Sequence, residues 1–96
     1  MSYDIYLKDA VGDITAELNI TYNYAKHYRM LGEKGIREIY GKTGAQSIPM
    51  LKNAISVLGD DVHDNYWEPT EGNAKRALMQ LLELAQMRPD GVWKGD

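Results

Sequence analysis

Residues 21–28 gather the side chains that are best suited to recognise a ligand. The stretch holds three of the seven tyrosines, one of the two histidines and an asparagine, in a chain without phenylalanine. Phenylalanine fills space without a hydroxyl that needs a partner, so a segment built from tyrosine presents hydrogen-bonding groups on aromatic rings. The candidate ligand-binding residues in this segment are Tyr22, Asn23, Tyr24, His27 and Tyr28.

The same residues also fit a purely structural interpretation. Tyr24 and Tyr28 share a helical spacing with Leu31, which is typical of a half-buried face whose hydroxyls reach solvent. Asn23 would then be the cap of the helix. In the ligand-binding interpretation the rings stack on a planar ligand, and Asn23 or Thr21 hydrogen-bonds the edge of that ligand. Both interpretations stay open at this point.

A second polar group surrounds the predicted start of a helix near residue 70. The first turn of a helix offers free N–H groups and the positive end of the helix dipole, which suit a phosphate or carboxylate. The candidate residues are Trp67, Thr70, Gly72, Asn73 and Arg76, with the glycine allowing close approach to the backbone. An ordinary capped helix is the alternative, because Glu71 would repel an incoming anion.

No catalytic or metal-binding motif stands out. Three aspartates and a histidine fall within residues 60–64, but their spacing does not match an EF-hand, and aspartates are common in solvated loops. Residues 41–44 contain Gly-Lys-Thr, yet a phosphate-binding loop would need glycine at position 36, which is Ile36. We therefore expect no catalytic residue, no metal and no cofactor.

Size and composition restrict the remaining possibilities. Ninety-six residues with 44% hydrophobic and 26% charged content predict one folded domain, residues 1–96. A net charge of -3 disfavours general nucleic-acid binding but permits a local basic patch. The chain has no cysteine, which excludes disulfides and thiolate metal sites, and it has neither a signal peptide pattern nor a long apolar run. We expect a cytoplasmic protein that does not bind membranes.

Alternating apolar residues predict an N-terminal β-hairpin. Tyr3, Ile5 and Leu7 alternate with polar positions, and the same pattern returns between Ile14 and Ile20, after a turn that contains Gly12. An isolated hairpin is marginally stable in water, so its apolar face must pack on helices. Its free edge and the small core lead us to expect a homo-oligomer.

Helical spacing predicts three to four α-helices after the hairpin. Helical segments are expected from Asn23 to the stop at Gly32, from Glu33 to Tyr40, from Ser47 to the stop at Gly59, and from the cap Thr70 to about Met87. Residues 60–69 are expected to be irregular, and Val92 and Trp93 to form a short docked tail. The predicted fold is α+β, an N-terminal antiparallel β-hairpin packed on three to four α-helices.

Several motifs together resemble a family of small proteins encoded by bacteriophages and prophages. The matching residues are Ser2 to Leu7, Asn19 to Tyr24, Gly35 to Arg37, Asp60-Asp61, Tyr66-Trp67, Thr70 to Ala74 and Arg88 to Trp93. Members of that family often carry a longer segment between the opening strand and the Asn-Ile-Thr-Tyr-Asn-Tyr motif. The resemblance implies an accessory protein that antagonises host defence inside an infected bacterium.

Two functions follow from these residues and this context. In the first, the two polar segments face each other and sequester a small phosphorylated, nucleotide-like ligand without chemistry. In the second, the protein is an inhibitor or adaptor that binds a host protein directly, with tyrosines and tryptophans as the main contacts.

Overall fold

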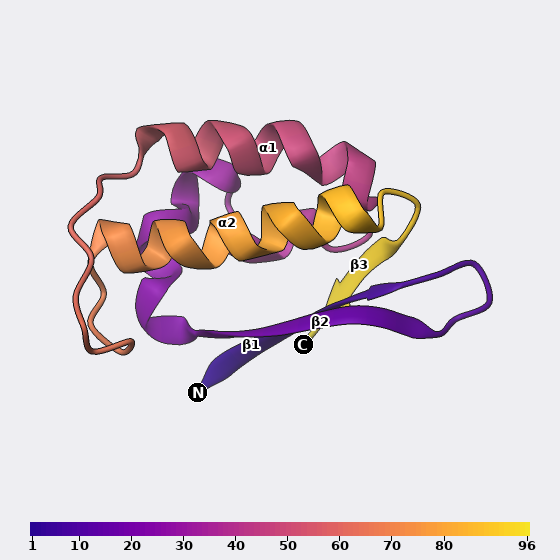
Figure 1. The fold of residues 1–96 in the computed structure, drawn as a ribbon, viewed down its shortest axis with the longest axis horizontal. Helices are drawn as coiled ribbons and strands as arrows, with labels where there is room; N and C mark the ends of the chain where they lie inside the picture. Colours follow the sequence, from indigo (N-terminus) through magenta and orange to yellow (C-terminus); the bar gives the residue numbers. More distant parts are fainter.

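Three antiparallel strands and four helical segments make up the chain in a computed structural model that describes all 96 residues. The elements are β1 (Ser2–Lys8), β2 (Ile14–Thr21), the 3-10 helices η1 (Tyr22–Leu31) and η2 (Gly35–Ile39), α1 (Gly44–Val57), α2 (Glu71–Met87) and β3 (Val92–Gly95). The sheet order is β2-β1-β3, and α1 and α2 lie together on one side of the sheet (Figure 1). The predicted α+β class is confirmed.

The N-terminal hairpin forms as predicted. β1 and β2 pair antiparallel, with Tyr3 opposite Ile20 and Ile5 opposite Leu18. Gly12 takes a positive φ of 90° in the connecting turn, a conformation that costs glycine little. Tyr3, Ile5 and Leu7 of β1 are buried, because side chains alternate between the two faces of a strand and this face points to the helices. The opposite face stays open.

The C-terminal residues extend the hairpin into a three-stranded sheet, which corrects the expected docked tail. Trp93 of β3 pairs with Leu7 of β1 and is fully buried. The backbone N–H of Trp93 donates to Lys42 O, and Gly41 donates its N–H to Trp93 O, both at 2.9 Å, so residues 41–42 cover the outer side of β3. β2 is therefore the edge strand whose outer side is not covered by another strand.

The two short helical segments between β2 and α1 are both of the 3-10 type. Thr21 caps η1, because its hydroxyl accepts the Asn23 N–H at 3.2 Å; the expectation that Asn23 is the cap was wrong. Gly32 ends η1 as predicted. The second segment covers only Gly35–Ile39 of the predicted stretch from Glu33 to Tyr40, and it buries Ile36 and Ile39.

Helix α1 begins three residues before the predicted start at Ser47. Thr43 and Gln46 form a capping box, in which Thr43 Oγ1 accepts the Gln46 N–H and Gln46 Oε1 accepts the Thr43 N–H. This reciprocal pair satisfies two end groups of the helix, so the helix starts at Gly44. The helix ends at Val57, before the expected stop at Gly59.

Helix α2 has the predicted bounds. Thr70 caps it by accepting the Asn73 N–H at 3.1 Å, and the helix ends at Met87. Its buried hydrophobic residues are Ala74, Ala77, Leu78, Leu81 and Ala85. Neither α-helix combines the length and the apolar character that crossing a membrane requires.

Ser47 and Trp93 form a buried hydrogen bond that we expect to matter for stability. The indole Nε1 donates to Ser47 Oγ at 2.8 Å, and both residues are fully buried. Ser47→Ala would leave the indole N–H without an acceptor and should cost about 1–2 kcal/mol of unfolding free energy. Urea unfolding measures this difference. Ser56→Ala is the control, since Ser56 is exposed on the same helix; equal costs for the two variants would contradict the expectation.

Candidate functional site

The structure brings the two predicted polar segments into direct contact. Three side chains of η1 hydrogen-bond main-chain carbonyls of the loop that connects α1 to α2, residues 58–70, hereafter the 58–70 loop. Asn23 Nδ2 donates to Trp67 O at 2.8 Å, and the Tyr24 hydroxyl donates to Tyr66 O. His27 Nε2 lies 2.7 Å from Pro69 O, and because a carbonyl only accepts, this nitrogen carries the proton. These contacts fill the space that a ligand between the segments would occupy.

The two central tyrosines of η1 belong to the core. Tyr24 and Tyr28 are both fully buried, and the Tyr28 hydroxyl donates to Ala74 O at 3.0 Å. Burial raises the pKa of each phenol above its ordinary value, with nearby tyrosines adding to the effect, so both remain protonated donors at neutral pH. A phenylalanine could not make either bond, which is the physical reason for tyrosine here.

Tyr22 takes part in a separate cluster at the end of the sheet. Its ring packs edge-on against Tyr3, with centroids 4.5 Å apart, and its hydroxyl accepts from Arg37 Nη2 at 3.2 Å. The Arg37 guanidinium also lies 4.9 Å from the Tyr3 ring centroid and donates from Nε to Asp96 O. Tyr22 therefore joins η1, η2 and the C-terminus, away from the other predicted site residues.

The chain itself occupies the anion position at the start of α2. The Gly72 N–H donates to Asp61 Oδ1 at 3.1 Å, and the Asn73 N–H donates to the Thr70 hydroxyl. A Cβ on Gly72 would lie 2.6 Å from Val62 N, so the glycine permits close approach of the 58–70 loop. The features that predicted an anion site thus bind an internal carboxylate.

Asn73 holds the 58–70 loop from the helix side. Its Oδ1 accepts the His63 N–H at 3.0 Å, and its Nδ2 donates to Asn65 O and Glu68 O, both at 3.1 Å. Only 6% of Asn73 is exposed. One amide side chain thereby satisfies three main-chain groups of a segment that has no regular structure of its own.

Tyr66 covers one end of the exposed β2 edge. Its hydroxyl accepts the Thr21 N–H at 3.1 Å and donates to Asn19 O at 3.3 Å, as the main chain of a neighbouring strand would. A register shift interrupts the hairpin near Leu7 and Lys8, at the other end of β2. The Tyr66 contacts shorten the free edge that led us to expect an oligomer.

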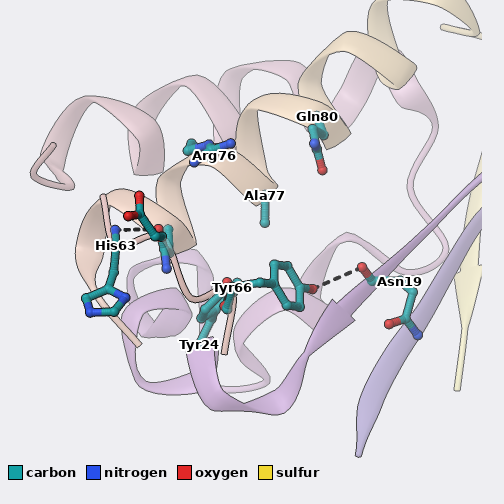
Figure 2. A pocket seen from close by; sticks show the side chains of 9 residues that line it. Asn19, Tyr24, His63, Tyr66, Arg76, Ala77 and Gln80 are labelled. Atoms are coloured by element: carbon teal, nitrogen blue, oxygen red, sulfur yellow. Dashed lines mark hydrogen bonds between the residues drawn. The ribbon is translucent and has the colours of Figure 1, made fainter. Parts of the chain in front are cut away.

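Next to these contacts lies a cavity of about 140 Å³ between α2, β2 and the 58–70 loop. Figure 2 shows Arg76, Ala77 and Gln80 along α2, with Tyr66 lying between Tyr24 and Asn19. Three lining residues, Tyr24, Asn73 and Arg76, belong to the set predicted from the sequence. Six do not: Asn19, His63, Asp64, Tyr66, Ala77 and Gln80. The spacing of residues 73, 76, 77 and 80, one face of a helix, is the sequence signal that could have predicted part of this wall.

Two aromatic residues of the 58–70 loop remain exposed beside this cavity. Tyr66 is 44% exposed and Trp67 is 56% exposed. Their rings pack edge-on with centroids 5.2 Å apart, and Tyr66 packs in the same way on buried Tyr24 at 5.6 Å. Hydrogen bonds to Asn23 and Asn65 fix the main chain of Trp67. The pair is thus an exposed aromatic surface with a rigid support.

The charged residues of the site are mostly engaged within the chain. Lys75 Nζ pairs with Asp60 Oδ1 at 2.7 Å, which is the one ion pair of the molecule, and Glu71 accepts the Gly59 N–H. Arg76, at the cavity, has no ion-pair partner. No group of three or more carboxylate or imidazole side chains lies close enough together to hold a metal ion.

Comparisons with protein-family models, with curated proteins and with solved structures gave no match. The geometry of the site therefore carries the functional inference.

We expect Asn73→Ala to destabilise the protein strongly, because three main-chain groups lose their partner at once. The predicted loss of unfolding free energy is about 2–4 kcal/mol, measured by urea unfolding. Asn53→Ala is the matched control, since Asn53 is an exposed asparagine on α1. A loss below about 0.5 kcal/mol for Asn73→Ala, within the range of ordinary surface substitutions, would contradict the role assigned to this side chain.

Proposed function

We propose that this protein is a non-enzymatic inhibitor or adaptor that acts by direct contact with another protein. The observation that supports the proposal best is the exposed Tyr66–Trp67 pair, held rigidly beside a small polar cavity. Tyrosine, tryptophan and arginine are the residues that most often dominate binding energy at protein interfaces, and all three are present here.

The support of the aromatic pair favours tight binding. Ordering a flexible loop on association costs free energy, which lowers affinity. In this protein the cost is already met within the fold, because Asn23, Tyr24 and Asn73 hold the main chain of the loop. A partner would meet Trp67 in a fixed position.

The size of the cavity also favours a protein partner over a nucleotide. Small-molecule sites usually enclose roughly 300–1,000 Å³. A cavity of about 140 Å³ accommodates one side chain or one oxyanion. Its lining offers the Arg76 guanidinium and the Gln80 amide to an acceptor, and the Asp64 carboxylate to a donor. A polar side chain of a partner, flanked by contacts to Trp67, matches this arrangement.

Sequestration of a small anionic ligand is the second candidate, and Arg76 is the observation that favours it. An arginine at a cavity without an ion-pair partner can hold a phosphate or carboxylate. A nucleotide bound there would place its phosphate on Arg76 and its base outside the cavity, against the exposed aromatic rings. Binding would then depend on Arg76 as strongly as on Trp67.

The biological setting is part of the same proposal. The resemblance to small bacteriophage proteins supports a role as an accessory factor that antagonises host defence in the bacterial cytoplasm. Either candidate function would serve that role, by blocking an effector protein or by removing a nucleotide signal.

The test is affinity capture from bacterial lysate with the wild-type chain, followed by affinity measurement for the captured partner. Trp67→Ala should weaken binding of that partner about 30-fold or more, as expected for a central interface residue. Met79→Ala is the control, because Met79 is an exposed apolar residue of α2, 47% accessible. Both variants should keep the wild-type melting temperature.

Two results would contradict the proposal. One is a partner whose affinity is the same for wild type and Trp67→Ala. The other is a small phosphorylated molecule that remains bound in native mass spectrometry and is lost in Arg76→Ala, which would favour the second candidate instead.

A further inference from the structure

Charge is distributed very unevenly along this acidic chain. Residues 22–42 contain five Lys or Arg and two Glu, a net charge of +3, whereas the remaining residues contain six Lys or Arg and twelve Asp or Glu, a net charge of −6. The positive segment corresponds to η1, η2 and their connections. This part of the surface therefore differs in sign from the rest of the molecule.

Three of these cations surround one concave site between η1 and η2. Lys26, Arg29 and Lys34 line a hollow of about 180 Å³, together with Tyr3, Ala25, Glu33 and Gly35. None of the three charged groups forms an ion pair or a hydrogen bond within the chain, although the main-chain N–H of Lys34 donates to Glu38 Oε1. Glu33 is the one carboxylate in the lining, so the hollow keeps an excess of positive charge.

Arg37 lies in the same region, but unlike these three cations it interacts with other groups of the chain. Its guanidinium contacts the rings of Tyr3 and Tyr22 and hydrogen-bonds Asp96 O, so its binding capacity is used inside the fold. Lys26, Arg29 and Lys34 are exposed and have no such partners. Three like charges around one hollow repel one another, and an anion placed between them would relieve that repulsion.

We propose that this hollow binds acidic side chains of the protein partner inferred above, and the inference rests on that proposed function. Asn23 and His27 of η1 contact the 58–70 loop, so the hollow and the aromatic pair flank the same short helix. A partner lying across η1 would reach both. Single-stranded nucleic acid fits less well, because a phosphate backbone is bound along a continuous positive track, whereas the chain outside residues 22–42 has a net charge of −6.

The probe is a fluorescein-labelled octaglutamate peptide, titrated with the full chain and followed by fluorescence anisotropy. Binding should be measurable at about 20 mM salt and should weaken as salt rises towards about 200 mM. The double variant Lys26→Glu/Arg29→Glu should weaken binding about tenfold or more, because it replaces two attractive charges with two repulsive ones.

The control is Lys52→Glu/Lys94→Glu, which changes the net charge by the same amount at exposed positions on α1 and β3. Circular dichroism and melting temperature verify that both variants fold. Equal weakening in the two double variants, or no binding at low salt, would overturn the proposal. A labelled octathymidylate serves as the nucleic-acid comparison. If it binds more tightly than octaglutamate, and Lys26→Glu/Arg29→Glu abolishes that binding, the assignment to a protein partner is overturned.

The two experiments distinguish a hollow that does not bind acidic side chains from a protein that does not bind a partner through Trp67. If a captured partner binds through Trp67 but octaglutamate does not bind, only the proposal that the hollow binds acidic side chains is contradicted. If octaglutamate binds through Lys26 and Arg29 while no partner depends on Trp67, the proposed function falls and the anion-binding hollow stands.

Discussion

The arrangement of the whole candidate site depends on how the main chain of the 58–70 loop is satisfied. An irregular segment cannot pair its own N–H and C=O groups in a ladder, and unpaired groups next to a core are costly. Five side chains of the flanking helices supply partners: Asn23, Tyr24 and His27 from η1, and Glu71 and Asn73 from α2. The loop is thereby fixed between two helices, and its exposed aromatic residues acquire a defined position.

Two buried tyrosines show why tyrosine is used where phenylalanine would fill the same space. The hydroxyls of Tyr24 and Tyr28 donate to main-chain carbonyls at positions 66 and 74. A tyrosine hydroxyl also bonds main-chain groups at the sheet edge, where Tyr66 donates to Asn19 O and accepts the Thr21 N–H. Polar aromatic residues thus join helix, loop and strand while filling the interior.

Local patterns predicted what local forces determine. The hairpin and the bounds of α2 follow from alternation, helical spacing and the Thr70 cap, all of which are visible in neighbouring residues. The strand Val92–Gly95 was missed, because its two apolar residues, Val92 and Trp93, show no alternation and its pairing with β1 joins opposite ends of the chain. The sequence also indicated that residues 22–28 meet residues 67–76, but not that hydrogen bonds would fill the space between them.

Hydrogen exchange of individual backbone amides in the wild-type protein tests the central claim most directly. The amides of Thr21, His63 and Gly72 donate to side chains of Tyr66, Asn73 and Asp61. A loop held in this way should slow exchange at His63 and Gly72, and Tyr66 should slow it at Thr21, by about 100-fold or more relative to an unstructured chain. Exchange of these amides at unprotected rates would show that the 58–70 loop is not fixed, and the rigid aromatic surface would have no basis.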